Sequence, residues 1–340
     1  MLKKLPKLLL PWFKENRRDL PWRSDRQPYH VWLSEIMLQQ TRVEAVKGYY
    51  ERFLQRLPTV QALAFAQEDE LLKLWEGLGY YSRVRNLQKA AKIICDTYGG
   101  VFPQQYEQIL ALPGIGAYTA GAISSICFEQ PTAAVDGNVL RVLSRFLASD
   151  APITDEKTKK HFAAELSKIY PDGHCGDFTQ ALMELGATVC VPNGAPMCES
   201  CPLRMHCKAF LQGTQLRYPI KTSKKPRRIE KRTVFILRCN EKLAVCKRPE
   251  KGLLAGLWQL PDVEGELSLS QMLLQAEAWG VHPRNILKTV QRSHIFTHVQ
   301  WELTGCYLEC GEEATFFWAS PEEIRENIGL PTAYRQFLEE

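Results

Sequence analysis

Four of the eleven cysteines lie close together in the chain, at Cys190, Cys198, Cys201 and Cys207. Their gaps of seven, two and five residues would let one short loop present four thiolates to a single centre. Four thiolates suit a tetrahedral zinc ion or an iron–sulfur cube, and the spacing alone does not separate the two. The other cysteines sit mostly in apolar runs, where cysteine behaves as a small buried hydrophobe. The loop of residues 190–207 is therefore a predicted metal centre.

A glycine-rich run at residues 112–121, Leu-Pro-Gly-Ile-Gly-Ala-Tyr-Thr-Ala-Gly, can join two helices. Pro113 and Gly114 end the first helix, and Gly116 lets the backbone turn tightly into the second. The free N–H groups at the start of the second helix can then bind an anion, and a DNA phosphate is the natural ligand. An ordinary corner between two helices is the alternative. The run predicts a helix-hairpin-helix over about residues 105–128.

About 20 residues further on, the chain reads Val135-Asp136-Gly137-Asn138-Val139. An aspartate followed by Gly-Asn at the start of a helix can be no more than an N-cap and a turn. Taken alone, these residues favour that capping role for Asp136.

Helices must position these residues, because residues 1–215 show apolar side chains at helical spacing almost throughout. Thr41 and Glu44 form a capping-box pattern, which predicts a helix from near Arg42 and leaves Gln39 and Gln40 at a junction. Another helix should end near Trp75, before Gly77-Leu78-Gly79.

The chain changes character after residue 232. Residues 233–238, 243–247 and 299–308 read as strands, residues 267–278 as a helix, and residues 320–338 as helical again. The second part is therefore predicted to be an α+β domain.

Length and charge agree with two domains joined by a linker. The 340 residues suffice for about two domains, and no apolar run is long enough for a membrane helix. Residues 1–220 carry 26 basic and 22 acidic side chains, residues 221–232 carry seven and one, and residues 233–340 carry 10 and 15. We expect residues 216–232 to form a basic linker that is either solvated or bound to phosphate. We read no signal peptide, and therefore expect a reducing compartment.

Taken in order, these motifs resemble the helix-hairpin-helix DNA glycosylase superfamily, and within it the MutY-type adenine DNA glycosylases. The resemblance rests on residues 20–23 (LPWR), residues 34–41 (SEIMLQQT), residues 77–81 (GLGYY), the hairpin, residues 135–139 and the four cysteines. It implies an all-α catalytic part over residues 1–215 with an iron–sulfur loop at 190–207. An α+β Nudix-like domain at residues 233–340 would follow.

The resemblance implies an enzyme that excises adenine mispaired with 8-oxoguanine or guanine and leaves an abasic site. Glu35 matches the family's acid, which protonates adenine, and Asp136 its ionised carboxylate, which stabilises an oxocarbenium-like sugar. Asn138 should orient Asp136 or a water. Tyr118 stands where endonuclease III-type relatives carry a lysine that forms a Schiff base, so we expect a glycosylase without strong lyase activity.

The resemblance also implies how DNA is held. Gln40 and Tyr80 match positions that insert into the duplex when a base is flipped out, and Arg23 matches a residue near the adenine pocket. The further expected DNA-binding residues are Leu38, Gln39, Thr41, Gly114 and Gly116. We also expect a monovalent cation at the helix-hairpin-helix.

For the cysteine loop the resemblance favours a [4Fe–4S] cluster over zinc, although the first gap is one residue longer than the family's usual six. In the second domain, residues 267–280 carry one glutamate, Glu277, where a working Nudix hydrolase needs several, so we expect recognition without hydrolysis. Phe296, Thr297 and His298 resemble the family's Phe-Ser-His loop that senses 8-oxoguanine.

Three alternatives remain: an endonuclease III-like pyrimidine glycosylase with lyase activity, an iron–sulfur electron carrier, and a non-catalytic DNA-binding module. Tyr118 and the second domain speak against the first, and Glu35, Asp136 and the hairpin against the second. The expected partner is duplex DNA, with no membrane; the expected state is a monomer in the cytoplasm, associated with the nucleoid.

Overall fold

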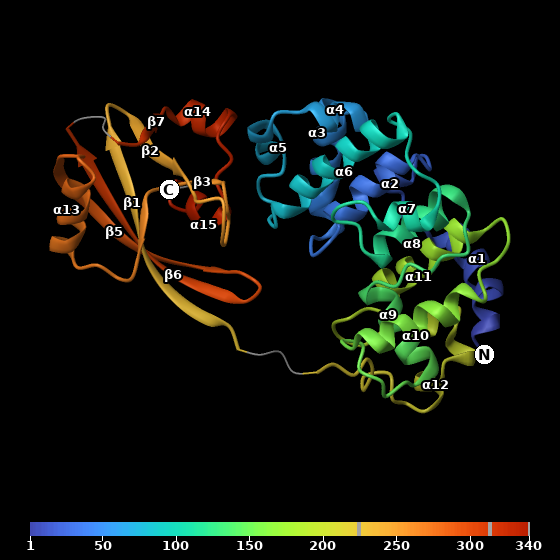
Figure 1. The fold of residues 1–340 in the computed structure, drawn as a ribbon. Helices are drawn as coiled ribbons and strands as arrows, with labels where there is room; N and C mark the ends of the chain where they lie inside the picture. The colour runs from blue at the N-terminus through green and yellow to red at the C-terminus, as the bar shows by residue number, and fades with distance from the viewer. Residues whose placement is uncertain (223–225, 312–314, 339–340) are drawn as a thin grey trace. The chain divides into compact units, whose positions relative to one another are not determined.

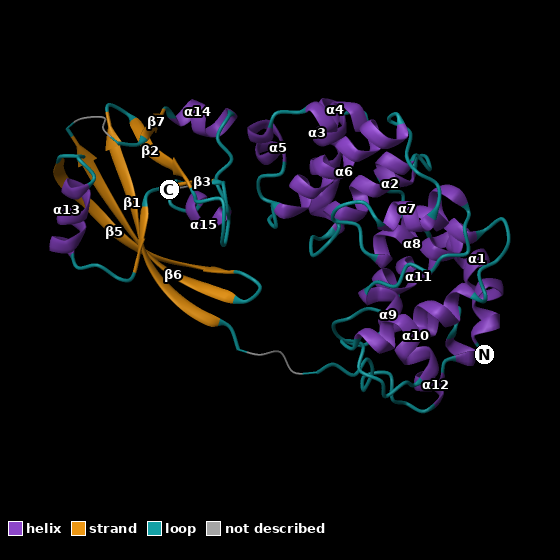
Figure 2. Ribbon diagram, in the orientation of Figure 1, coloured by secondary structure: helices purple, strands orange, loops and turns teal. Residues whose placement is uncertain are grey.

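The computed structural model describes residues 1–222, 226–311 and 315–338 (Figures 1 and 2). The chain forms two compact units, which are described separately. The first comprises Met1–Phe65 and Asn86–Ser223, and the second comprises Ala66–Arg85 and Lys224–Glu340. In the described parts of the chain, no helix has the length and apolar character needed to cross a membrane.

The first part of the chain is helical, as predicted. Its helices are α1 (Leu5–Asn16), α2 (Pro28–Met37), α3 (Val43–Arg56), α4 (Val60–Phe65), α5 (Glu68–Leu74), α6 (Ser82–Tyr98), α7 (Tyr106–Leu110), α8 (Ala117–Phe128), α9 (Gly137–Leu147), α10 (Glu156–Ser167), α11 (Cys175–Thr188) and α12 (Lys208–Leu211). Short 3-10 helices cover Leu2–Lys4, Pro21–Arg23, Cys198–Ser200 and Arg204–His206.

One apolar core in the first unit joins the beginning and the end of the helical region. It contains Leu5 and Leu9 of α1, Leu143 and Phe146 of α9, and Phe178 of α11. These side chains recur at helical spacing, so each helix turns one apolar face inward. The core brings α9 and α11 together, and both helices contribute residues to the site.

The helix-hairpin-helix lies where it was predicted, as α7 and α8 joined by residues 111–116. The tight turn depends on Gly114 (φ +77°), where a Cβ would lie 2.6 Å from Cβ of Asn86. Gly116 has φ −96°, so it is not the glycine that makes the turn. Its surroundings are open, which leaves the backbone at the start of α8 accessible.

The capping-box prediction at Thr41 is wrong. Helix α3 begins at Val43 with Arg42 as its N-cap, and no side chain caps it. The Thr41 hydroxyl instead donates to the Gln39 carbonyl oxygen at 3.5 Å. Gln39 and Gln40 do lie at a junction, and Gln40 has φ +61°.

The α+β prediction for the second part is confirmed. Its elements are β1 (Arg228–Cys239), β2 (Lys242–Lys247), β3 (Trp258–Gln259), β4 (Asp262–Glu264), α13 (Leu269–Ala278), β5 (Pro283–Ile295), β6 (Val299–Cys310), β7 (Phe317–Ala319), α14 (Pro321–Glu326) and α15 (Thr332–Arg335). The long strand β5 was not predicted, because its polar, mostly exposed residues carry little hydrophobic signal. The single helical region expected at 320–338 is two short helices.

The sheet has the order β3-β2-β1-β6-β5, with β4 paired to β1 and β7 paired to β2. Strands β1 and β6 run parallel and the other pairs are antiparallel, so the sheet is mixed. Alternate residues of β1 enter two separate cores: Val234 and Ile236 pack with residues of α14 and α15, and Phe235 and Leu237 with residues of α13. Helices therefore cover both faces of the sheet (Figure 1).

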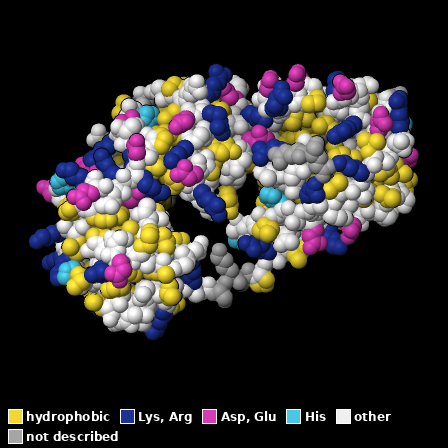
Figure 3. Space-filling model, turned by 180° about the vertical axis from the view of Figure 1, so that it is seen from behind, with side chains coloured by type: hydrophobic (Ala, Val, Ile, Leu, Met, Phe, Trp, Pro, Cys, Tyr) yellow, Lys and Arg dark blue, Asp and Glu magenta, His cyan; other side chains and the backbone are white. Residues whose placement is uncertain are grey.

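The basic linker was predicted at residues 216–232, of which residues 223–225 lie outside the described residues. Strand β1 begins at Arg228, five residues before the expected start of the second domain, so residues 228–232 belong to the sheet. Three of its cations face carboxylates: Arg228 pairs with Glu230, Lys231 with Glu266 and Arg232 with Asp262. On the face drawn in Figure 3, Lys and Arg side chains are likewise interspersed with Asp and Glu. The charge of this stretch is therefore partly neutralised within its own fold.

Candidate active site

A cavity of about 950 Å³ opens in the first unit. Three of its lining side chains come from α2, α8 and α9: Glu35 from the last turn of α2, Tyr118 from the first turn of α8, and Asp136 as the N-cap of α9. Asn138, Arg23, Gly116 and residues 38–41 also line it. All four predicted catalytic residues therefore meet in one cavity, whereas Gly114 does not line it.

Glu35 is only 6% exposed and has one strong hydrogen-bond partner in the cavity, the hydroxyl of Tyr118, which donates to Oε2. Loss of water on burial raises the pKa of Glu35 to about 7, and the nearby charge of Asp136 adds to this. The Tyr118 hydrogen bond works in the opposite direction. Burial and the two carboxylates also raise the pKa of the Tyr118 phenol well above its usual value, so that group keeps its proton.

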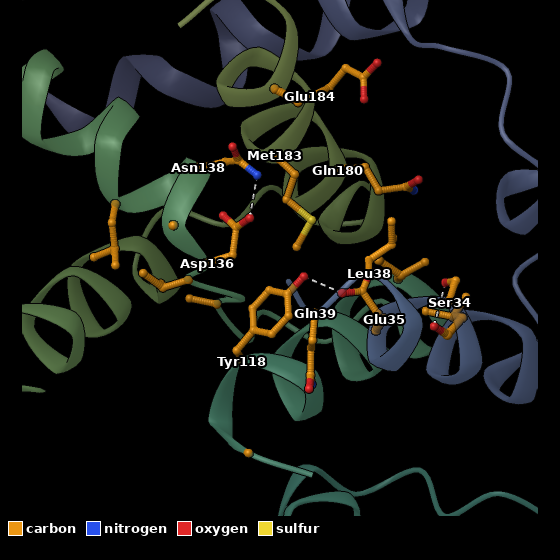
Figure 4. Close-up of a pocket in the computed structure, with 18 of the residues that line it drawn as sticks. Ser34, Glu35, Leu38, Gln39, Tyr118, Asp136, Asn138, Gln180, Met183 and Glu184 are labelled. Atoms are coloured by element: carbon orange, nitrogen blue, oxygen red, sulfur yellow. Dashed lines mark hydrogen bonds between the residues drawn. The ribbon is translucent and has the colours of Figure 1, made fainter. Parts of the chain in front are cut away.

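Asp136 is held more tightly than Glu35. Its Oδ1 accepts from the Val139 N–H at 2.7 Å, and its Oδ2 accepts from Nδ2 of Asn138 at 2.7 Å. Burial raises the pKa of Asp136, while these hydrogen bonds oppose the rise by favouring the charged form. Asp136 thus caps α9 and also points a carboxylate into the cavity. Figure 4 shows Glu35 and Asp136 on either side of the Tyr118 hydroxyl.

A buried arginine orients Asn138. Nη2 of Arg141 donates to Oδ1 of Asn138 at 2.7 Å, and also to the Gly186 carbonyl oxygen at 2.7 Å. This bond fixes which end of the Asn138 amide faces Asp136. Helix α11 approaches closely here, because a Cβ on Gly186 would lie 2.5 Å from Cβ of Asn138.

Arg23 lies at the cavity wall as part of an ion pair. Its Nη2 donates to Glu184 at 2.8 Å, and Nε of Arg18 donates to the other oxygen of Glu184 at 2.7 Å. The Glu184 side chain has no exposed surface. Burial works against its charge, but the hydrogen bonds from the two arginines hold the pKa of Glu184 below its usual value.

The four predicted metal-binding cysteines line one small cavity of about 30 Å³, together with Arg145 and Arg204. Arg145 is 4% exposed, and its Nη1 donates to Sγ of Cys190 at 3.3 Å. Burial raises the pKa of the Cys201 thiol to about 12. Among the described residues, no three His, Cys, Asp or Glu side chains are close enough to hold a single metal ion. The four thiols do line one shared space.

In the second unit, two other predicted residues meet. Oη of Tyr80 lies 2.6 Å from Oγ1 of Thr297. Tyr80 is 45% exposed and has φ +49°, a left-handed conformation that is unusual for a bulky residue. Thr297 and His298 are exposed at the turn between β5 and β6, while Phe296 packs against Trp301 with ring centroids 4.8 Å apart.

Several residues of the site were not predicted. They are mainly charged groups on α9 and α11 and the polar Gln180, which lines the cavity. The sequence does mark these charged residues, because each lies within an apolar run. Glu184 lies in residues 181–185 (ALMEL), and Arg141 and Arg145 lie in residues 139–147 (VLRVLSRFL). A charge in such a place is buried and must be paired.

The chain matches two known families. Residues 33–168 match the HhH-GPD superfamily of base excision DNA repair proteins, and residues 233–340 match the NUDIX domain. The structure of a thermostable thymine-DNA glycosylase superposes with a TM-score of 0.57 at 29% identity, covering 62% of this chain and 97% of that one. Fold and site thus define a helix-hairpin-helix DNA glycosylase followed by a NUDIX domain.

Relatives that match most of the chain identify the family more closely. The adenine DNA glycosylase of Mus musculus is 37% identical over 350 residues, which cover 86% of this chain and 68% of the relative. That of Buchnera aphidicola subsp. Acyrthosiphon pisum (strain APS) is 32% identical over 341 residues, covering 98% and 96%. The chain belongs to the family of MutY-type adenine DNA glycosylases.

The buried Glu35 should affect stability in a way that depends on pH. The pKa of Glu35 is about 7 in the folded chain, against 4.5 for an unperturbed glutamate. The stability that the protonated group contributes is therefore complete below pH 4.5 and is lost as pH rises through 7. Glu35→Gln removes this titration, so the variant should exceed the wild type in unfolding free energy by about 3 kcal/mol at pH 8. Denaturant unfolding at several pH values measures the difference, which should shrink towards pH 4.5. The exposed Glu51→Gln on α3 is the control, and a difference for Glu35→Gln that does not change with pH would contradict the assignment.

Proposed function

We propose that the protein removes adenine mispaired with 8-oxoguanine or guanine in duplex DNA by hydrolysing its N-glycosidic bond, which leaves an abasic site. The observation that carries this proposal is the pairing of a buried, proton-holding carboxyl, Glu35, with a second carboxylate, Asp136, in one cavity. A glycosidic bond to a poor leaving group needs both an acid and a stabiliser of positive charge.

Glu35 is suited to the role of the acid. A pKa of about 7 keeps much of the group protonated at neutral pH, yet allows it to give the proton away. Since Oε2 accepts from Tyr118, the other oxygen is available to donate to a ring nitrogen of adenine. Protonation makes adenine a better leaving group, and the bond to the sugar can break.

Asp136 is suited to the role of the stabiliser. As the C–N bond breaks, the sugar gains positive charge, and a carboxylate held by the Val139 N–H and Asn138 can face that charge without reorganising. A water then attacks the sugar and passes a proton to Glu35, which became a carboxylate when it protonated adenine, and an abasic site results. Arg141 supports this geometry through Asn138.

Tyr118 is the reason for proposing a glycosylase without strong lyase activity. Its phenol hydrogen-bonds to Glu35 but has no amine with which to form an imine. A chain that cut the strand through a Schiff base would need a lysine at this place in the cavity.

The flipped adenine would enter the cavity between the carboxylates and the polar wall formed by Arg23, Glu184 and Gln180. Leu38, Gln39, Gln40 and Thr41 line the same cavity and are suited to contact the strand from which the base is taken. The turn at Gly114 and the open backbone at Gly116 are suited to hold a phosphate, with a monovalent cation at the carbonyl oxygens of the turn.

The NUDIX domain is proposed to recognise 8-oxoguanine without hydrolysing nucleotides. Residues 267–280, which include α13, carry the single carboxylate Glu277, where a working Nudix hydrolase needs several glutamates. Thr297 and His298 are exposed at a turn and can reach a base edge. The partner would be duplex DNA, bound by a monomer in the cytoplasm.

For the cysteine loop we propose a [4Fe–4S] cluster. Four thiols that line one small space suit a cube whose iron atoms are each held by one thiolate. Cys190, Cys198, Cys201 and Cys207 would hold it, and Arg145 would offset their negative charge. The cluster would supply structural order to this loop.

Release of adenine from a duplex containing adenine opposite 8-oxoguanine tests the proposed reaction. Under single-turnover conditions the wild type should release free adenine, and Glu35→Gln should be slower by a factor of about 10²–10⁴. Because the acid must be protonated, the wild-type rate should fall about tenfold per unit of pH above roughly 7. Glu51→Gln should match the wild type. Unchanged adenine release by Glu35→Gln would remove Glu35 from the chemistry.

Borohydride trapping tests the absence of lyase activity. The wild type should not be trapped on mispaired DNA, whereas Tyr118→Lys should give some covalent complex because its amine can form an imine that borohydride reduces. Tyr118→Phe, which gains no amine, is the matched control. Strong trapping of the wild type on damaged-pyrimidine DNA, without adenine release, would favour the lyase alternative.

Metal and sulfide analysis tests the cofactor. The purified chain should contain about four iron atoms and four sulfide ions, and Cys198→Ser should lose most of both. Cys95→Ser, outside the loop, should retain them. Zinc in place of iron, with no sulfide, would refute the cluster.

A further inference from the structure

One segment of the chain belongs to the first part by sequence and to the second part by packing. Residues 66–85 fall within the 33–168 match to the HhH-GPD superfamily, yet they form one compact unit with residues 224–340. The segment contains α5 and the turn that presents Tyr80. Its contacts within this unit therefore decide where Tyr80 lies relative to the NUDIX domain.

Two residues at the end of α5 form an anchor, here called the Lys73–Glu76 anchor. Nζ of Lys73 donates to Oε2 of Glu76 at 2.8 Å, to the Ile324 carbonyl oxygen at 3.1 Å and to the Ile328 carbonyl oxygen at 3.2 Å. All three ammonium donors are thus used, and the carbonyl groups they bind lie at the end of α14. Oε1 of Glu76 accepts from the Leu330 N–H at 2.9 Å.

The anchor is largely shielded from water. The Lys73 and Glu76 side chains are 21% and 13% exposed, so their interactions are screened less than a surface pair would be. The backbones also approach closely, because a Cβ on Gly329 would lie 3.2 Å from the Leu72 carbonyl oxygen. A contact of this kind tolerates little movement of α5.

From the anchor, a braced turn leads to Tyr80. Nε1 of Trp75 donates to the Gly79 carbonyl oxygen at 3.0 Å, and the Arg83 guanidinium donates to the same oxygen at 3.1 Å. The guanidinium carbon of Arg83 lies 5.3 Å from the Trp75 ring and 5.5 Å from the Tyr80 ring. These contacts hold the turn to the end of α5, so the position of Tyr80 depends on the position of α5.

Thr297, which contacts Tyr80, lies on a loop that packs on the same apolar core as the backbone groups of the anchor. Trp301, against which Phe296 packs, lies in one apolar core with Ile324, Ile328 and Leu330. The carbonyl groups that bind Lys73 and the loop that carries Thr297 are thus supported by one set of buried side chains. The 2.6 Å contact between Tyr80 and Thr297 joins the Tyr80 turn to this loop.

We propose that Lys73 and Glu76 are positioning residues for the recognition of 8-oxoguanine. They hold α5 on the NUDIX domain so that Tyr80 and Thr297 act together on the base opposite adenine. This inference rests on the proposed function. It adds that the preference for 8-oxoguanine over guanine depends on an ammonium–carboxylate pair that touches neither base.

The test compares adenine release by the full chain from duplexes with adenine opposite 8-oxoguanine and opposite guanine. Lys73→Met should lower the ratio of the two rates about tenfold, mainly by slowing the 8-oxoguanine duplex. Lys73→Arg, which keeps the charge and can bind the same carbonyl oxygens, should restore part of the ratio. Glu76→Gln should act in the same direction as Lys73→Met.

A double variant separates positioning from general stability. If Lys73 acts through Tyr80, Lys73→Met should have little further effect on the ratio once Tyr80→Phe has removed the hydroxyl. Lys247→Met is the matched control, because its ion pair with Asp69 joins the same two segments but is about half exposed. Thermal unfolding of each variant identifies any that fails to fold, and Lys73→Arg then carries the test.

Each outcome bears on a different claim. Equal losses on both duplexes, full additivity with Tyr80→Phe, or an unchanged ratio in Lys73→Met would overturn the positioning role. No adenine release by the wild type from either duplex would instead overturn the proposed function.

Discussion

The carboxyl of Glu35 is almost fully buried, and this constraint shapes the cavity in which it lies. A charged carboxylate there is costly, so the group holds its proton to about pH 7. Helix α2 must deliver Glu35 from an otherwise apolar face, and α8 must begin where Tyr118 can donate to it. The hairpin before α8 meets this second requirement, because the turn at Gly114 sets where α8 starts.

The other buried carboxylates near the site have several hydrogen bonds that favour their charged form. Glu184 is fully buried yet remains charged, because two arginines bind it. Asp136 is held by a backbone N–H and by Asn138, which Arg141 orients in turn. Arg141 also donates from Nε to the Cys190 carbonyl oxygen at 2.7 Å, so the Asp136 side and the cysteine loop share one guanidinium. The same cavity thus holds Glu35, whose hydrogen bond comes from the neutral phenol of Tyr118, and two carboxylates with several partners each, Glu184 and Asp136.

The helices, the hairpin and the α+β second part could be predicted, because apolar spacing and turn residues are local signals. The grouping of Glu35, Tyr118 and Asp136 required the resemblance to a family, since no local rule brings residues 35, 118 and 136 together. Strand β5 was missed because its stability comes from pairing with β6 along the chain and not from its own apolar residues. Arg141, Glu184 and Lys73 were missed because their partners are distant in sequence and become visible only once the chain is folded.

The placement of residues 66–85 shows that the two parts of this protein are not interchangeable modules. In sequence the second part follows the first, but the folded second unit also takes in residues 66–85, which lie more than a hundred residues before the rest of that unit. A chain cut at the linker would leave Lys73 and Glu76 without the backbone groups they bind. Recombination at that point would therefore succeed only with a replacement domain that offers α5 an equivalent surface, which ties the evolution of both parts together.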